Sequence, residues 1–118
     1  MEEKNTNENL MDKENEILRV TQRAVEMLKT VYDPEIPVNI YDLGLIYKVD
    51  YDVDKKVLHV DMTFTAPGCP AADFLFEDAR QKLLSVEGPE SVDLRVVYDP
   101  VWCQDMMSEE AKLELGFL

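Results

Sequence analysis

The fold is decided by a stretch in which the spacing of hydrophobic residues changes part-way along. Residues 57–86 read VLHVDMTFTAPGCPAADFLFEDARQKLLSV. The first part, up to Phe64, alternates apolar and polar residues, which is typical of a strand with one buried face. From about Pro70 onward, apolar residues recur with the 3.6-residue period of a helix. The Pro-Gly-Cys-Pro segment between them is a turn by composition. The sequence therefore predicts a strand, a turn that contains Cys69, and a helix.

The predicted strand sorts its side chains onto two faces. The apolar face carries Leu58, Val60, Met62 and Phe64, and the polar face carries His59, Asp61 and Thr63. Residues 45–51 alternate in the same way. Their side chains expected on one side are Leu45, Tyr47, Val49 and Tyr51. A turn at residues 52–55 joins the two segments, so we expect an antiparallel hairpin with one buried and one polar face.

Further elements flank this hairpin. Helical periodicity begins near Asn15 and is expected to stop before Pro34, because the residue before a proline avoids the helical region. Residues 33–43 contain two prolines and are predicted to form an ordered loop with one helical turn near its end. Residues 91–98 alternate and predict a third strand. Its inward side chains would be Val92, Leu94, Val96 and Tyr98. Ser108 is expected to cap a short last helix.

The predicted elements occur in the order helix, strand, strand, helix, strand, helix. This order favours an α+β fold, a two-layer sandwich with helices on one face of a small mixed sheet of about three strands. The polar outer face would carry Lys48, Asp50, His59, Asp61, Asp93 and Arg95. At 118 residues, the chain is long enough for one domain with a real core. We assign that domain to residues 15–118 and expect residues 1–14, which are polar and mostly acidic, to be a disordered tail.

The formal net charge of −13 limits the class of partner. Nucleic-acid binding is not expected, because phosphate contacts need clustered Lys and Arg. Docking on an anionic membrane surface is not expected for the same reason, and no stretch approaches the roughly 18 apolar residues of a membrane span. The charge instead favours a basic protein partner. Two cysteines are too few for a disulfide framework, so we expect free thiols in a reducing compartment, the cytoplasm.

Cys69 is the most informative residue. Proline is favoured at the first helical position, so Pro70 predicts that Cys69 is the N-cap of the central helix. The unpaired N–H groups and the positive dipole end there would stabilise a thiolate, the nucleophilic and metal-binding form of cysteine. Gly68 would let the backbone approach a ligand closely. From spacing alone, a small buried apolar residue is an equally good interpretation of Cys69.

Three carboxylates lie in the proline-containing loop, those of Asp33, Glu35 and Asp42. Carboxylates on a rigid loop could bind a cation, accept a proton or contact a basic partner. For Asp33 and Asp42, the sequence favours a simpler interpretation, in which the side chains make turns and helix caps.

The second thiol, Cys103, is too far from Cys69 in the sequence to form a local metal motif. Both cysteines follow strands that could be neighbours, in which case both thiols could face one site. Two thiols cannot complete the four-thiolate set of an iron–sulfur cluster. A two-fold dimer would supply four, and a partner or glutathione could also fill the gap. A structural zinc site is not expected, because the single histidine, His59, lies within a strand.

Three segments resemble, in order, the signatures of SufT/PaaD-type iron–sulfur cluster assembly domains. They are residues 33–47, DPEIPVNIYDLGLIY; residues 62–70, MTFTAPGCP; and residues 99–102, DPVW, with residues 106–112, MMSEEAK. The similarity spans roughly residues 15–118, and three motifs in the right order make it specific. The resemblance implies a small α+β fold. It also implies a role in the maturation of iron–sulfur proteins, in transfer or targeting rather than as an enzyme with classical turnover.

The resemblance also implies which residues act. The family site gathers the motif cysteine, here Cys69, with the acidic loop, here Asp33 and Glu35, and with two motif threonines, here Thr63 and Thr65. Cys69 would be a transient ligand of iron or of an iron–sulfur cluster, or a nucleophile that accepts a persulfide. The two carboxylates would orient Cys69 or help to handle metal, and the threonines would donate hydrogen bonds to bound sulfur. The partners implied are the iron–sulfur assembly machinery and client apo-proteins.

The chain departs from the family pattern in three ways. Cys103 stands where members commonly carry a small residue such as threonine, so we keep it only as a candidate cluster ligand. The additional C-terminal cysteines of phenylacetate-pathway members and the fused phosphate-loop ATPase of other relatives are missing, which favours a stand-alone SufT-like protein. Three interpretations stay open: a cluster carrier or assembly factor that uses Cys69, a metal-free acidic adaptor, and a thiol-dependent transferase. A phenylacetate-pathway maturation protein is a further alternative.

Overall fold

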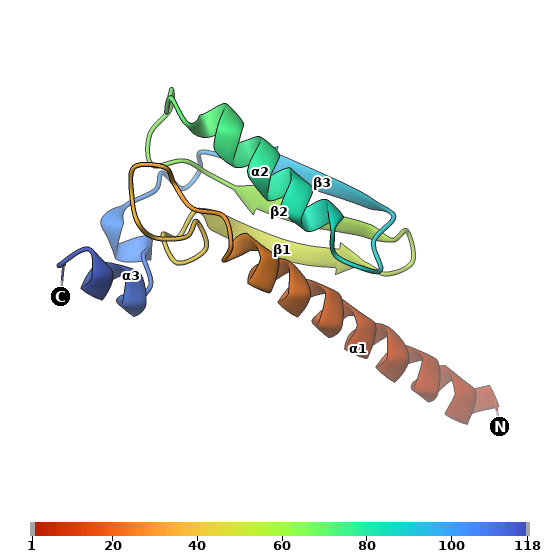
Figure 1. Ribbon diagram of the computed structural model, residues 1–118. Helices are drawn as coiled ribbons and strands as arrows, with labels where there is room; N and C mark the ends of the chain where they lie inside the picture. The colour runs from red at the N-terminus through yellow and green to blue at the C-terminus, as the bar shows by residue number, and fades with distance from the viewer. Residues whose placement is uncertain (1, 118) are drawn as a thin grey trace.

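The computed structural model describes residues 2–117. Along the chain, its elements are α1 (Glu2–Leu28), β1 (Ile46–Asp52), β2 (Val57–Met62), α2 (Ala72–Leu84), β3 (Ser91–Val96), the 3-10 helix η1 (Gln104–Met106) and α3 (Glu109–Glu114). This order and the three-stranded mixed sheet confirm the predicted α+β fold (Figure 1). In the described part of the chain, no helix combines the length and the apolar character needed to cross a membrane.

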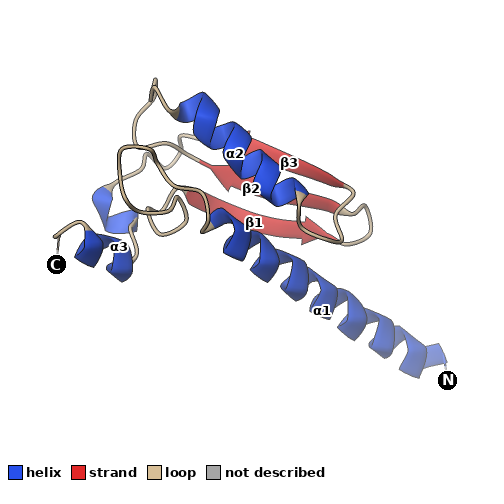
Figure 2. Cartoon of the chain, viewed as in Figure 1, coloured by secondary structure: helices blue, strands red, loops and turns tan. Residues whose placement is uncertain are grey.

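The sheet has the strand order β1-β2-β3, with β1 antiparallel to β2 and β2 parallel to β3. Both α1 and α2 cover the same face of this sheet (Figure 2). Helix α1 packs against β1 and α2, and α2 packs against β3. The core lies between the two layers, and its largest buried side chains include Leu28, Ile40, Leu43, Leu45, Leu58, Met62, Leu75 and Leu83.

The strand register confirms the two faces predicted for β2. Leu58, Val60 and Met62 are fully buried under the helices. His59 and Asp61 alternate with them and are only half-buried. The outer face of the sheet therefore carries two polar rows. One row is Asp50, His59 and Asp93, and the other is Lys48, Asp61 and Arg95.

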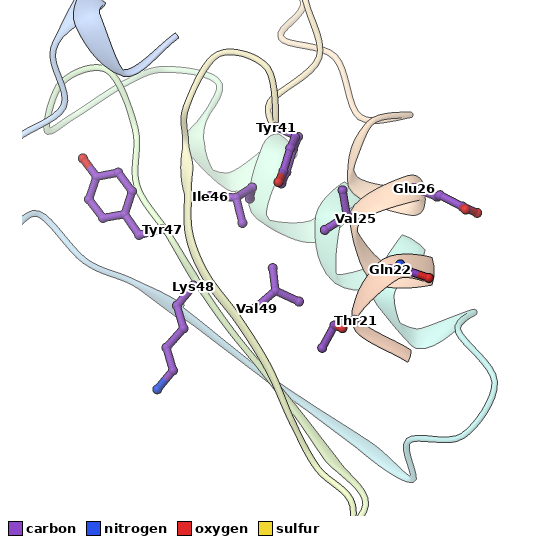
Figure 3. Close-up of a pocket in the computed structure, with 9 residues that line it drawn as sticks. All are labelled: Thr21, Gln22, Val25, Glu26, Tyr41, Ile46, Tyr47, Lys48 and Val49. Atoms are coloured by element: carbon purple, nitrogen blue, oxygen red, sulfur yellow. The ribbon is translucent and has the colours of Figure 1, made fainter. Parts of the chain in front are cut away.

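A β-bulge at the start of β1 reverses the orientation predicted for Tyr47. The pairing with β2 shifts between Ile46 and Lys48, which leaves Tyr47 as the extra residue. As a result, Ile46 and Val49 point toward α1, whereas Tyr47 and Lys48 point away from it (Figure 3). The prediction that Tyr47 shares a face with Val49 is wrong, because strict alternation ends where a bulge inserts a residue.

Helix α1 begins earlier than the periodicity suggests. Residues 2–14 continue α1, where the sequence analysis expects a disordered tail. This segment contains no proline or glycine, so nothing in it interrupts a helix that is held in place further along the chain. Lys13 Nζ also lies 3.0 Å from Asp54 Oδ1 in the turn between β1 and β2. The domain boundary at residue 15 stays a prediction.

Strand β3 contributes less to the core than predicted. Val92 and Leu94 are half-buried, but Val96 and Tyr98 are 37% and 43% exposed. The strand lies at the edge of the sheet and its pairing with β2 ends at Val96. Val96 pairs with the buried Met62 and so lies on the predicted face, but it is exposed because it ends an edge strand. The position predicted for Tyr98 within the strand is wrong, because β3 ends at Val96.

Candidate functional site

One cavity brings together four of the predicted site residues. Asp33, Glu35, Thr65 and Cys69 all line a cavity of about 280 Å³. One wall is the loop that follows α1, and the other is the turn between β2 and α2, residues 65–71. These segments are far apart in the sequence, and the fold places them side by side. The cavity is the strongest candidate for a functional site.

Cys69 lies in the cavity wall, but not at the helix end predicted for it. Helix α2 begins at Ala72 with Ala71 as its N-cap, because the chain makes one more turn after Pro70. In that turn, the Ala72 N–H donates to the Cys69 carbonyl at 3.0 Å. The side chain of Cys69 is half-buried and packs against the core on one side. Cys69 is therefore a thiol at the edge of the core that also borders the cavity.

Gly68 shapes the turn beside this thiol. Its φ of +77° lies in the left-handed region that glycine adopts without a steric penalty. No atom lies within 4 Å of the position that a Cβ would occupy, so this side of the turn faces open space. The backbone beside Cys69 is thus accessible to a guest.

The two carboxylates of the cavity differ in how they are held. The Glu35 N–H donates to Asp33 Oδ1 at 2.8 Å, the side-chain turn that the sequence favours for Asp33. Glu35 is exposed at the rim of the cavity. Asp33 therefore shapes the loop, while the Glu35 carboxylate is available to a guest or a partner.

Asp42 is part of the scaffold and lies outside the cavity. Its carboxylate accepts from Asn39 Nδ2 at 2.8 Å, and its backbone carbonyl accepts from the Ser108 N–H at 2.8 Å. Ser108 in turn caps α3 by accepting from the Ala111 N–H, which confirms the predicted cap. These bonds support the structural interpretation of Asp42.

Thr63 is the one predicted site residue of the central motif that does not reach the cavity. It is fully buried, and its Oγ1 has no hydrogen-bond partner of ordinary geometry. The prediction of a solvent-facing Thr63 is wrong, because the residue is fully buried with Tyr47 beside it. The hydroxyl lies beside Tyr47 and partly offsets the rise that burial causes in the pKa of that phenol. Of the two motif threonines, only Thr65 borders the cavity.

Cys103 is exposed and lies outside the cavity. Strands β2 and β3 are neighbours, as the sequence analysis supposes, yet the chain after β3 turns toward β1. Tyr47 donates its hydroxyl proton to the Pro100 carbonyl at 2.9 Å, with Met106 Sδ at 3.3 Å. Burial raises the pKa of Tyr47, and the nearby Cys103 thiol raises it further. Cys103 thus belongs to a loop anchored by Tyr47, residues 97–107, which we call the closing loop.

The anchors of the closing loop are the residues that sequence reasoning missed. Trp102 donates its indole N–H to the Leu43 carbonyl at 2.8 Å. Gly44 has a φ of +83°, and a Cβ there would collide with the backbone of Met106. All of these residues fall within the first and third family motifs, so the motifs contained the signal. The bulge that orients Tyr47 toward the closing loop could not be inferred from the alternation of apolar and polar residues in the sequence.

The cavity could hold an iron–sulfur cluster only as a guest with ligands from elsewhere. Within residues 9–117, whose side chains the structure describes, no group of three or more His, Cys, Asp and Glu side chains is arranged to hold a metal ion. A cluster requires four thiolates or equivalent ligands, and the cavity offers one thiol. The residues present therefore fit a cluster in transit, with Cys69 as one of its ligands, better than a resident cofactor.

The outer face of the sheet carries a network of charged side chains that is separate from the Cys69 cavity. His59 Nδ1 lies 3.0 Å from Asp93 Oδ2, and Arg95 donates to the same oxygen from Nε and Nη2 at 3.1 and 3.0 Å. Hydrogen bonds from Arg95 and then His59 lower the pKa of Asp93, and Asp93 raises the pKa of Arg95. This network fixes a polar surface that contains no part of the cavity.

Known proteins share this sequence and fold. A sequence model of the family described as "Iron-sulfur cluster assembly protein" matches residues 21–96. The chain belongs to the iron–sulfur cluster assembly protein family. It is 60% identical over 104 residues to the Fe-S protein maturation auxiliary factor of Porphyromonas gingivalis, which covers 88% of this chain and 98% of that one. It is 40% identical to SufT, a factor of the same name in Staphylococcus aureus, over 73% of this chain and 97% of SufT.

Solved structures agree with the sequence relatives. A domain of unknown function from Bacillus anthracis superposes with a TM-score of 0.79 at 32% identity, covering 87% of this chain and 97% of that domain. A conserved hypothetical protein of Thermotoga maritima gives a TM-score of 0.70 at 33% identity, covering 80% and 92% of the two chains. These comparisons confirm the resemblance to SufT-type domains and the α+β architecture.

Proposed function

We propose that this member of the family is a maturation factor that passes iron–sulfur clusters to client apo-proteins, with Cys69 as its working thiol. The observation that supports the proposal most strongly is the shared cavity of Cys69, Asp33, Glu35 and Thr65. Family membership supports the general role, and the maturation auxiliary factors and an iron–sulfur cluster carrier protein among its relatives support it further.

The chemistry proposed is ligand exchange. A thiolate at Cys69 takes the place of one ligand of a cluster that a donor protein presents, and it leaves when a client supplies its own cysteine. Glu35, exposed at the rim, accepts the thiol proton or contacts iron, and Asp33 holds the loop in place. Thr65 donates a hydrogen bond to cluster sulfur. The cluster is cargo in this scheme, the protein is not a turnover enzyme, and it acts in the reducing cytoplasm with the assembly machinery.

Anaerobic reconstitution with ferrous iron and sulfide tests the role of Cys69. Wild type, Cys69→Ser and Cys103→Ser are compared by visible absorbance and native mass. Wild type and Cys103→Ser are expected to gain thiolate-to-iron charge-transfer absorbance, and Cys69→Ser is expected to lose it. Equal absorbance of Cys69→Ser and wild type would remove Cys69 from the proposal.

A metal-free adaptor is the second candidate, and the net charge of −13 favours it. An adaptor would bind a basic assembly protein with an affinity that falls as salt rises, and it would show no chromophore after reconstitution. A thiol-dependent transferase, the third interpretation, would instead leave a persulfide or acyl adduct on Cys69 that mass spectrometry detects.

A further inference from the structure

The outer edge of β1 lies opposite the edge formed by β3. Strand β1 comes first in the strand order, and among the described residues no other strand pairs with its outer side. An edge strand presents a row of unpaired N–H and C=O groups that can pair with another chain. With seven residues, Ile46–Asp52, β1 is long enough to form such a ladder.

A hollow runs along this edge between β1 and α1. Its volume is about 770 Å³, and its walls are residues 21–26 of α1, residues 46–49 of β1 and Tyr41. Val25, Ile46 and Val49 point into the space between the helix and the strand (Figure 3). All three are only half-buried. The edge therefore combines unpaired backbone groups with uncovered aliphatic surface.

The charges on β1 specify what can pair with it. Lys48 and Asp50 flank Val49, both are exposed, and neither takes part in an ion pair with the side chains described for residues 9–117. If a second β1 runs antiparallel with Val49 opposite Val49, each Lys48 comes to lie opposite the Asp50 of the other strand. Two opposite-charge pairs then form from one pair of residues. The edge is complementary to itself, as an isologous two-fold interface must be.

We propose that the outer edge of β1 is a homodimer interface, where two copies pair antiparallel about a two-fold axis at Val49 and form one six-stranded sheet. In this register, the second copy places its own Val49 against Val49, at the end of the hollow. A lysine alone often protects an edge strand from pairing. Here Asp50 of a second copy can pair with Lys48, so the edge favours an identical partner in one register.

The dimer keeps the two cavities apart. Strand β2 runs antiparallel to β1, so Cys69, which follows β2, lies at the end of the sheet where β1 begins. In the proposed dimer, the two β1 strands run antiparallel and therefore begin at opposite ends of the β1–β1 interface. This dimer therefore has one Cys69 cavity at each end, and it does not gather four thiols around a shared cluster. The inference uses no part of the Cys69 site, so it stands or falls separately from the proposed function.

Reversing the charges of Lys48 and Asp50 at the β1–β1 interface tests both the dimer and its register, measured by analytical ultracentrifugation at about 0.15 M salt. Lys48→Asp and Asp50→Lys each create two like-charge pairs and should raise the dissociation constant of the homodimer about tenfold or more. The exchange variant, Lys48→Asp with Asp50→Lys, should restore it. An equimolar mixture of the two single variants should form heterodimers. Lys55→Glu, an exposed change in the turn at the end of β1, is the matched control and should leave the dissociation constant unchanged.

Each other outcome overturns the inference. A wild type that stays monomeric at millimolar concentration shows that the edge doesn't pair. A dimer that is unaffected by the single reversals, or that the exchange variant fails to restore, places the interface elsewhere or in another register. Circular dichroism of the variants shows that they are folded, so loss of the dimer is not confused with loss of the fold.

Discussion

The two cysteines occupy equivalent positions in the topology and have different surroundings. Each follows one of two neighbouring parallel strands, Cys69 after β2 and Cys103 after β3. Cys69 is half-buried and shares a cavity with two carboxylates and a threonine. Cys103 is exposed on the closing loop, which is held by Tyr47 of β1 and by the bond from Trp102 to the Leu43 carbonyl. The comparison teaches that position at a strand end does not define a site, because the segments that meet there do.

The largest expected effect comes from a substitution at Gly44, where the closing loop packs against the chain before β1. Gly44→Ala places a Cβ against the backbone of Met106 at a φ of +83°, so overpacking and backbone strain add together. We expect a loss of about 3 kcal/mol in the free energy of unfolding, measured by urea denaturation. Gly68→Ala is the matched control, because its φ is similar but its Cβ meets open space; it should cost about 1 kcal/mol. Equal losses of unfolding free energy in the two variants would contradict the close contact between Gly44 and the Met106 backbone.

The next effect sharpens the contrast between the two thiols. Trp102→Phe removes the hydrogen bond to the Leu43 carbonyl and loosens the closing loop. We expect a loss of about 1.5 kcal/mol and faster alkylation of Cys103 in particular. Mass spectrometry after timed labelling reads both cysteines in one sample. Cys69, in a different segment, serves as the internal control, and equal acceleration of both thiols would indicate global loosening rather than release of one loop.

A smaller effect concerns Tyr47 and depends on pH. Tyr47→Phe removes the bond to the Pro100 carbonyl and should cost about 1 kcal/mol near neutral pH. Because burial raises the pKa of Tyr47, the folded state holds this proton more tightly than the unfolded state does. The stabilisation is complete below the ordinary tyrosine pKa of about 10 and is lost as pH rises through the folded pKa. The stability difference between wild type and variant should therefore shrink above about pH 10; a constant difference would contradict the assigned shift.

The smallest effect lies on the outer face, away from both thiols. Asp93→Asn removes the shared partner of Arg95 and His59. Since these partners lower the pKa of Asp93, its stabilisation exists above the unfolded pKa and is lost as pH falls through the folded pKa. The variant should be slightly less stable than wild type at pH 7, and the two should converge below about pH 4. Thermal unfolding across that range measures it, and divergence at low pH would argue against the network.

The order of the elements was predictable, and so was the division of the β2 side chains between a buried and a polar face. Both depend only on the period of the hydrophobic residues. Leu58 and Val60 face the core and His59 does not, as alternation requires. The same rule failed at Tyr47, where a bulge inserts a residue, and at Thr63, which is buried beside Tyr47. Both failures come from contacts between segments that are distant in the sequence, which no local pattern contains.

The candidate site was predictable in membership but not in geometry. The resemblance named Cys69, Asp33, Glu35, Thr63 and Thr65 together, and the fold brings all of them except Thr63 to one cavity. Pro70 suggested a helix start that the chain delays to Ala72, because a turn closed by the Cys69 carbonyl comes first. The separation of Cys103 from the cavity depends on where the closing loop is anchored, and Tyr47 and Trp102 decide that only in three dimensions.

Cluster transfer compares the two thiols most directly. A scaffold protein loaded with a [4Fe–4S] cluster is mixed anaerobically with an apo-enzyme whose activity requires that cluster, and the rate of activation is followed with wild type, Cys69→Ser or Cys103→Ser present. The account predicts that Cys103→Ser accelerates activation as wild type does and that Cys69→Ser does not. Acceleration by Cys69→Ser at the wild-type rate, with Cys103→Ser inactive, would contradict it.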